Sequence, residues 1–403
     1  MTIATGVEKV VSMKKETTWN ALPGVSGAQV MRRVKCMASL KKETYESAEM
    51  RSDYQVADFR HGVRSAVVSL EGEMSPGSYQ MPFAALLRRA FTSGVALSGV
   101  SLTIAGSGPT YTITGTGFLT GAGLKQYDVI RLSVGALNAA NLLKNFFILS
   151  LTNTVLTVIP LNGVAPVAEG PIVTCTLTVV GKKSWVPLTG HTDESYSLEQ
   201  WWPSVPASEV FTGLKMQKID VGLPASGMSK FKCEMLGANI VTSTSQYFTS
   251  PTPAGTSGVF AAVNGAISAN GATVALITGI EFSGSGNMTG EPVVGSNTYP
   301  DIFEGRVQVS GQMTVLFDGP TYRDLFINET EVSIGIALTS SNSGIADFMT
   351  FVCPRVKAGG AEKDDGEKAS VQTIPFTALL ATSGGNGIAN EQTTLSIQDS
   401  LAV

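Results

Sequence analysis

The side chains that most often carry out catalysis are scarce in this chain of 403 residues, and they stand far apart. The two histidines, His61 and His191, both lie in polar stretches without a nucleophile or a metal ligand at a recognised spacing. The sequence contains no H-E-x-x-H zinc-protease pattern, no G-x-S-x-G nucleophile turn and no phosphate-binding P-loop. We therefore expect no catalytic residues, and the sequence predicts that the protein is not an enzyme.

Metal and cofactor sites are not indicated either. The cysteines are single and widely spaced, so we expect buried free thiols in a protein folded in a reducing compartment; they are Cys36, Cys175, Cys233 and Cys353. The acidic segment 362–368 lacks the alternating carboxylates of a calcium loop and predicts a hairpin tip. The glycine runs within 115–121 and 284–290 are one residue too long for a dinucleotide fingerprint. The sequence predicts no metal and no cofactor.

Composition narrows the range of partners. The formal net charge is −4, whereas a protein that grips duplex DNA needs basic surface to neutralise phosphates. Charged residues make up only 15% of the chain, below the roughly 25% of ordinary soluble domains. A chain with so little charge is expected to hide surface in an assembly. No apolar run reaches the roughly 20 residues of a membrane span, and residues 1–29 lack a secretory signal and predict an extended N-terminal arm.

An internal repeat predicts the elements that would position any site. A repeat is considered first because it determines the architecture of the whole chain. Each copy reads as a strand, a long polar loop, a D-x-x-x-G turn and a second, alternating strand with a G-x-M step. These elements lie at 34–40, 41–57, 58–62 and 67–75 in the first copy and at 274–282, 283–300, 301–305 and 306–314 in the second. Within the turns His61 corresponds to Glu304, which argues against a shared catalytic role.

Both copies continue in the same order. A proline heads a short apolar segment in each copy, at 82–91 and 320–328, which predicts one short helix per copy because proline is tolerated in a first helical turn. The strands that follow are expected at 195–202, 214–221 and 229–236 in the first copy and at 331–338, 351–358 and 370–380 in the second. An ordered series of this length predicts a duplicated, mainly β module.

The repeat also predicts the domain boundaries. Residues 94–183 interrupt the first copy with short β runs, and a segment of this size can form a small barrel or sandwich with its own core. Because insertions are tolerated where both ends meet at the surface, we expect an accessory β-domain on the outside. The first module is then discontinuous, at 30–93 and 184–241. Residues 242–260 are rich in Ser, Thr, Pro and Gly and predict a linker, and residues 261–403 form the second module.

The order of these elements resembles the tail tube (major tail) proteins of long, non-contractile-tailed bacteriophages. The resemblance is clearest in RVQVSGQMTVLFDGPTYRDLFINETEVSIGIAL (306–338) and in GVRSAVVSLEGEMSPGSYQMPFAALLRRAF (62–91), and it extends from about residue 30 to residue 400. It implies a mainly β fold with two tandem tail-tube-type β-sandwich modules, each with a short helix, and an inserted small all-β domain.

The resemblance implies a structural virion protein that polymerises as stacked rings into the phage tail tube, the channel for DNA passage into the host. Since most single-module relatives form six-subunit rings, two modules per chain imply a trimeric ring with pseudo-sixfold symmetry. The implied partners are further copies of the chain, the tail terminator and tail tip proteins, the tape measure protein within the lumen, and DNA in transit without specific binding. The implied location is the phage tail, assembled in the host bacterial cytoplasm without membrane insertion.

In this family a long loop of each module contacts the next ring. Those loops correspond here to residues 41–57, which are highly charged, and to residues 283–300, which are not, so the contacts of the two modules are expected to differ. The candidate contact residues are Lys41, Lys42, Glu43, Tyr45, Arg51, Asp53, Tyr54, Asn287, Met288, Glu291, Asn297 and Tyr299. A second class of function stays open, namely a β-sandwich adhesin or capsid decoration protein that uses residues 94–183 for surface binding.

Overall fold

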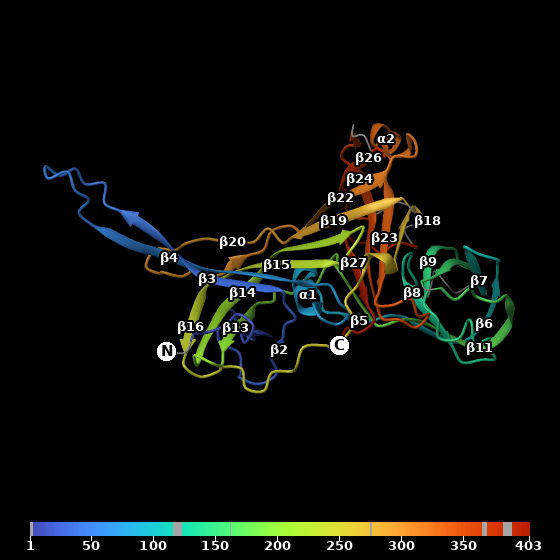
Figure 1. The fold of residues 1–403 in the computed structure, drawn as a ribbon, viewed down its shortest axis with the longest axis horizontal. Helices are drawn as coiled ribbons and strands as arrows, with labels where there is room; N and C mark the ends of the chain where they lie inside the picture. The colour runs from blue at the N-terminus through green and yellow to red at the C-terminus, as the bar shows by residue number, and fades with distance from the viewer. Residues whose placement is uncertain (1–2, 116–122, 162, 275, 365–368, 382–388) are drawn as a thin grey trace.

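The computed structural model describes residues 3–403 except 116–122, 162, 275, 365–368 and 382–388. The described part is mainly β and confirms the predicted fold class, with two β-sandwich modules that each carry a short helix, and an inserted all-β domain. The modules lie side by side in the middle of the molecule, the inserted domain lies at one end, and a long hairpin projects from the other end (Figure 1).

The first module combines strands from both sides of the insertion. Its elements are β1 (Val10–Lys15), β2 (Gln29–Val30), β3 (Lys35–Glu46), β4 (Phe59–Glu73), α1 (Gln80–Leu87), β13 (Tyr196–Trp202), β14 (Ala207–Pro224), β15 (Lys230–Gly237) and β16 (Asn239–Ser243). One sheet has the order β3-β4-β15-β14 and the other β2-β1-β13-β14-β16. The long strand β14 therefore belongs to both sheets, with its first half in one and its second half in the other.

The second module repeats this plan. Its elements are η1 (Ala262–Asn264), β17 (Gly265–Ala269), β18 (Ala272–Thr273), β19 (Ile277–Ser285), β20 (Thr289–Gly290), β21 (Ile302–Phe303), β22 (Gln308–Leu316), α2 (Thr321–Ile327), β23 (Val332–Thr339), β24 (Phe348–Ala358), β25 (Glu362–Lys363), β26 (Val371–Ala378) and β27 (Ser396–Asp399). One sheet has the order β19-β22-β26-β24 and the other β18-β17-β23-β24-β27. Here β24 is the strand shared by both sheets, as β14 is in the first module.

The repeated G-x-M step has a packing cause. A Cβ atom added to Gly72 would lie 2.0 Å from the hydroxyl of Tyr79, and one added to Gly311 would lie 2.7 Å from the ring of Phe376. Each glycine thus leaves room for an aromatic side chain over the strand, and the methionine two residues later is buried in both copies. Gly72 and Gly311 therefore occupy equivalent positions in β4 and β22.

The inserted domain is a closed barrel with the strand order β10-β7-β6-β11-β8-β9. Its strands are β6 (Ala96–Ala105), β7 (Tyr111–Gly115), β8 (Val129–Ser133), β9 (Phe146–Leu151), β10 (Val155–Pro160) and β11 (Glu169–Val179). The strands that flank it, β5 (Thr92–Ser93) and β12 (Lys182–Trp185), pair with each other, and β12 also pairs with β27 of the second module. The barrel interrupts the first module in sequence but is attached to a sheet of the second.

Several local predictions are wrong. The segment 41–57 is not all loop, because β3 continues to Glu46 and β4 begins at Phe59. The turn predicted to end at Gly62 is absent, since Gly62 lies within β4 under the ring of Tyr45. Polar residues did not exclude strands here because a two-stranded ribbon can expose both of its faces. The strand β1 within the N-terminal arm was not predicted.

Two further predictions fall partly outside the described residues. Of the segment 362–368, Glu362 and Lys363 form β25, while residues 365–368 are not described. Of the first glycine run, Gly115 ends β7, while positions 117 and 121 are not described.

One apolar core passes through both modules. Phe83 of α1 packs against Phe231 of the first module, with ring centroids 5.5 Å apart, and against Phe351 of the second module at 5.7 Å. Phe351 in turn contacts Phe282 of β19 at 5.1 Å. The helix of the first module therefore lies in the interface between the modules.

The last strand carries a buried carboxylate that joins the modules. Asp399 accepts hydrogen bonds from the backbone N–H of Gly77 at 2.8 Å and of Leu401 at 2.9 Å. Burial outweighs these bonds and raises the pKa of Asp399 to about 6. Because the folded chain then holds this proton more tightly than the unfolded chain, Asp399 disfavours the folded state once it is ionised.

We expect stability to fall as the pH rises from about 4 to about 6, by up to about 3 kcal/mol from this group. An Asp399→Asn variant keeps an acceptor for Gly77 and is expected to lose this part of the pH dependence. Urea unfolding across this range measures the effect, with Asp220→Asn, a change at a partly exposed carboxylate, as control. An unchanged slope in Asp399→Asn would assign the dependence to another group.

Candidate functional site

The two modules share one continuous sheet. Residues Lys218–Pro224 of β14 pair in antiparallel fashion with Gly279–Ser285 of β19. This contact joins the two four-stranded sheets edge to edge, and we call the result the joined sheet. Within the described residues its two outer edges are β3 on one side and the end of β24 with β25 on the other.

One side of the joined sheet packs on the core and the other side is polar. Residues on this polar side are called the polar sheet face. In the first module they are mainly charged, namely Lys35, Glu71, Glu73, Lys218, Asp220, Lys230, Lys232 and Glu234. In the second they are mainly uncharged, namely Glu281, Ser283, Ser285, Gln308, Ser310, Gln312, Thr314, Thr373, Thr377 and Lys357. A groove of about 680 Å³ runs over this face from β15 to β26.

The lysines of the polar sheet face lie beside carboxylates. Lys218 pairs with Asp220 at 2.9 Å and Lys232 pairs with Glu234 at 2.7 Å. Lys232 also lies directly opposite Asp220 and Glu71 on the neighbouring strands. The hydrogen bond to Glu234 raises the pKa of Lys232, so the lysine stays charged and compensated. The face therefore alternates in sign and has little net charge.

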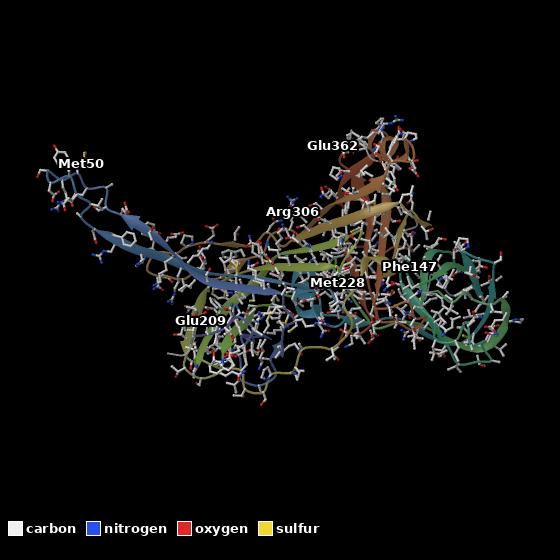
Figure 2. The ribbon with its side chains drawn as sticks, in the orientation of Figure 1. Met50, Phe147, Glu209, Met228, Arg306 and Glu362 are labelled. Carbon is white, nitrogen blue, oxygen red and sulfur yellow. The ribbon has the colours of Figure 1, made fainter. Side chains whose placement is uncertain are left out.

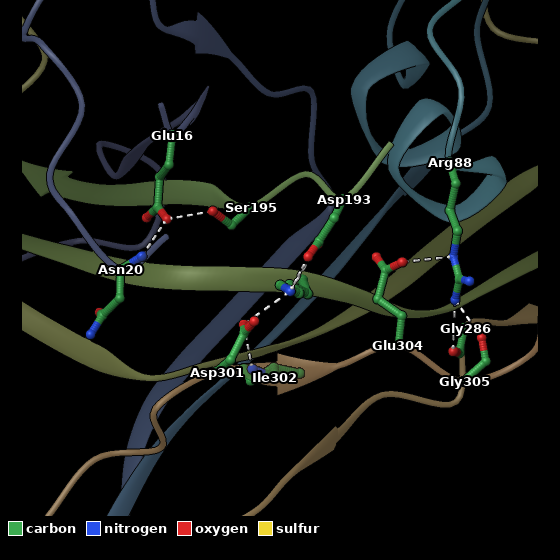
Figure 3. Close-up of polar contacts among 11 residues, drawn as sticks. Glu16, Asn20, Arg88, Asp193, Ser195, Gly286, Asp301, Ile302, Glu304 and Gly305 are labelled. Atoms are coloured by element: carbon green, nitrogen blue, oxygen red, sulfur yellow. Dashed lines mark hydrogen bonds and ion pairs between the residues drawn. The ribbon is translucent and has the colours of Figure 1, made fainter. Parts of the chain in front are cut away.

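A cluster of charges bridges the modules, and we call it the junction cluster (Figure 3). Lys215 of β14 has a side chain that is only 3% exposed and contacts Asp193 at 2.8 Å and Asp301 at 3.0 Å. Arg88, at the end of α1, contacts Glu304 at 3.1 Å and donates a hydrogen bond to the carbonyl of Gly305 at 2.5 Å. Two cations of the first module thus hold the loop that precedes β22.

Titration at the junction cluster follows its geometry. Burial raises the pKa of Glu304, Arg88 opposes the rise, and Asp193 adds to it. Burial acts to lower the pKa of Lys215, but hydrogen bonds to Asp193 and Asp301 overcome that effect and raise it. Lys215 is therefore held in its charged form between carboxylates of both modules.

The long loops of the two modules lie in different surroundings. Residues 286–306 of the second module fold back along the first module, where the carbonyl of Asn297 accepts a hydrogen bond from the N–H of Arg64 at 2.9 Å. The equivalent segment of the first module is a two-stranded ribbon, residues 41–65, which projects away from the molecule with Met50 near its tip (Figure 2). We call this segment the ribbon.

The barrel is docked on the second module through a buried charge pair. Lys183 of β12 contacts Asp128 of the barrel and, at 3.5 Å, Glu391. Beside it, the amide of Gln398 donates hydrogen bonds to the carbonyls of Val129 at 2.9 Å and Val180 at 2.7 Å.

The same interface has an apolar part. Tyr127 lies against Gly335, where a Cβ atom would come within 2.4 Å of its ring, and its hydroxyl is 2.9 Å from that of Ser333. Phe147 belongs to the same buried group and lies between barrel and second module (Figure 2). Polar and apolar contacts together fix the barrel against β23, β24 and β27.

The predicted ring-contact residues separate into two groups. Those of the first module are exposed along the ribbon, namely Lys41, Lys42, Glu43, Tyr45, Arg51, Asp53 and Tyr54. Those of the second module have mixed surroundings, because this loop folds back along the first module. Met288 is only 4% exposed, Asn287 bonds to the carbonyl of Arg306 at 2.7 Å, and Tyr299 is half-buried, while Glu291 and Asn297 have exposed side chains. The side chain of Met288 is thus buried within the chain rather than available for an external contact.

The residues considered for chemistry are dispersed. His61 lies on the ribbon against Phe59, with ring centroids 5.1 Å apart, and His191 lies in an exposed loop. The cysteines are buried and free. In the described part of the chain no group of three or more His, Cys, Asp or Glu side chains is placed to hold a metal ion. Sequence reasoning missed Lys215 and Arg88, because no pattern marks a lysine or arginine whose partners lie on distant segments.

Comparison with known proteins agrees with this architecture. A search of curated proteins finds no match. None of the helices in the described residues has the length and apolar character needed to cross a membrane. The family model described as phage tail tube protein matches residues 6–378, which includes both modules and the barrel. The chain therefore belongs to the phage tail tube protein family, a family of structural proteins of the virion tail.

Proposed function

We propose that three copies of this chain close into a ring with pseudo-sixfold symmetry, and that rings stack into a tube that conducts DNA into the host. The proposal rests on the junction between the modules. Since β14 and β19 join two sheets edge to edge within one chain, the same contact between chains pairs the edge of β24 and β25 with β3 of the next copy. Ring closure would also remove exposed strand edges, which otherwise invite aggregation.

The polar sheet face is proposed to line the channel, because the opposite side of the sheet packs on the core. Lysines on this face would bind DNA phosphates if they were free, but carboxylates at 2.7–2.9 Å compensate Lys232 and Lys218. In a ring, charged stripes from first modules would alternate with uncharged stripes from second modules. The wall would act as a passive conduit without catalytic activity.

The remaining parts follow from this placement. The tip of the ribbon, with Arg51, Asp53 and Tyr54, is proposed to reach an adjacent ring. Asn287, Glu291 and Asn297 are the exposed candidates of the second module. The barrel, predicted to cover residues 94–183, would lie on the outer wall of the tube. The tape measure protein would occupy the lumen during assembly, and terminator and tip proteins would end the tube.

Electron microscopy of the purified chain and of virions tests the proposal. Hollow tubes with threefold rings and peripheral knobs are expected. A chain that stays monomeric under every assembly condition, or rings with strict sixfold symmetry, would contradict it.

Charge reversal on the polar sheet face should affect DNA passage more than assembly. We expect phage carrying Asp220→Lys and Glu234→Lys to form tubes of normal length but to eject DNA at least tenfold more slowly, because uncompensated lysines would hold phosphates. Time-resolved DNA release at two salt concentrations measures this, and high salt should restore the rate. Ser283→Thr and Ser310→Thr on the same face serve as neutral controls. Unchanged ejection would show that this face does not line the channel.

A further inference from the structure

The helix of the second module is far less covered than that of the first. In α1, Leu86 and Leu87 are at most 1% exposed, whereas every residue of α2 is at least partly exposed. On α2, Phe326 is 44% exposed and Ile327 is 63% exposed. A cavity of about 40 Å³, lined in part by Leu325, lies beneath the helix. Among the described residues, the exposed apolar surface of α2 thus has no covering partner.

The residues that pack on α1 indicate which segment would pack on α2. Leu86 lies on β19 so closely that a Cβ atom at Gly284 would come within 2.6 Å of it. Phe83 contacts Phe351 of β24, and Arg88 pairs with Glu304 in the loop before β22. The helix of the first module is therefore covered by the second module of the same chain. By the repeat, the counterparts of β19 and of this loop are β3 and the ribbon.

The ribbon carries an apolar surface of its own. Below its tip, the exposed large apolar side chains are Tyr45 at 52%, Val56 at 65% and Phe59 at 48%. Apolar side chains gathered on one exposed segment mark a contact surface in a soluble protein. The ribbon and α2 lie at different extremities of the molecule (Figure 1), so they cannot cover each other within one chain.

We propose that the exposed apolar surface of α2, formed by Phe326 and Ile327, binds the part of the ribbon below its tip from a second copy in the same ring, and we call this surface the seat. The proposal rests on the proposed function and deepens it. A head-to-tail contact of this kind closes into a ring when the rotation permits. Leu86 and Leu87 end α1 as Phe326 and Ile327 end α2, and the C-cap residue Arg88 has its counterpart in Asn328. Since His61 corresponds to Glu304, the ion pair that covers α1 is replaced by uncharged Asn328 and by His61 in the contact between chains.

The first test compares two substitutions at matched exposure. Ile327→Asp places a charge in the proposed seat, and Val173→Asp places one on the barrel, where Val173 is 64% exposed. We expect Ile327→Asp to raise the protein concentration needed for ring formation at least tenfold while the monomer stays folded by circular dichroism. Val173→Asp should assemble normally. Normal assembly of Ile327→Asp would overturn the proposal.

A photo-crosslinking amino acid at position 326 provides a test that does not depend on disrupted assembly. In tubes, crosslinks to residues 41–49 and 55–61, below the ribbon tip, are expected, and the denatured ladder should stop at three chains because the ring is closed. A ladder beyond three chains would place the contact between rings, and crosslinks elsewhere would remove the ribbon from this seat; both overturn the proposal but leave the tube intact. If the unmodified chain forms no rings, the proposed function fails and the seat fails with it.

Discussion

Replacement of Lys183 by methionine is expected to lower the free energy of unfolding by about 3–5 kcal/mol, because it leaves Asp128 buried without its cation. Burial already raises the pKa of Asp128, and Lys183 opposes that rise. In the variant Asp128 can bind a proton and become neutral, which removes the cost of a buried charge. The loss in the free energy of unfolding should therefore become smaller as the pH falls. Denaturant unfolding at neutral and acidic pH measures both effects.

Two further variants distinguish a buried charge from lost packing. Lys183→Met combined with Asp128→Leu should recover part of the loss, because the fully buried carboxylate is removed and only Glu391, 3.5 Å from Lys183, still loses its cation. Recovery is expected to be incomplete, since Asp128 also accepts a hydrogen bond from the N–H of Lys125 at 3.0 Å. Lys182→Met, a change at a half-buried neighbour on the same strand, should cost little. A large loss in both single variants would point to β12 itself.

Replacement of Lys215 by methionine is expected to destabilise the junction cluster by about 2–3 kcal/mol, because Asp193 and Asp301 lose the cation between them. The loss is smaller than at Lys183, since both carboxylates are partly exposed. We expect the variant to impair the proposed ring formation more strongly than it impairs folding, because the loop before β22 would no longer be held on the first module. Sedimentation and unfolding curves of the same samples measure the two effects.

The matched control for this change is Lys218→Met, which removes a lysine from the same strand but from an exposed ion pair with Asp220. Exposed pairs contribute at most about 1 kcal/mol. Equal destabilisation by both variants would show that the junction cluster has no special part in holding the modules.

The repeat allowed much of the fold to be predicted from sequence. The alternating strands around 306–314 and 331–338 became β22 and β23, and both proline-led segments became helices. The alternation of apolar and polar residues failed to predict strands where both faces of a strand are exposed. The ribbon is exposed on both sides, so its polar residues resembled a loop.

The junction could not be predicted because its contacts have no local signal. Lys215 and Asp301 are distant in sequence, and each resembles an ordinary surface residue until the sheets pair. The docking surface of the barrel could not be predicted for the same reason, since the insertion interrupts the first module but docks on the second. Gly335 could have been recognised in part from the sequence, as a glycine within a strand rich in β-branched residues.

The position of β27 has a consequence for synthesis on the ribosome. Protein chains emerge from the N-terminus, so the barrel can fold well before β23, β24 and β27 exist to receive it. The last strand, Ser396–Asp399, then closes against both β12 and β24. A chain that stops before β27 is expected to leave the edges of β12 and β24 unpaired and exposed, and it lacks part of the docking surface for the barrel. Synthesis of residues 396–399 is thus a condition for pairing both strands.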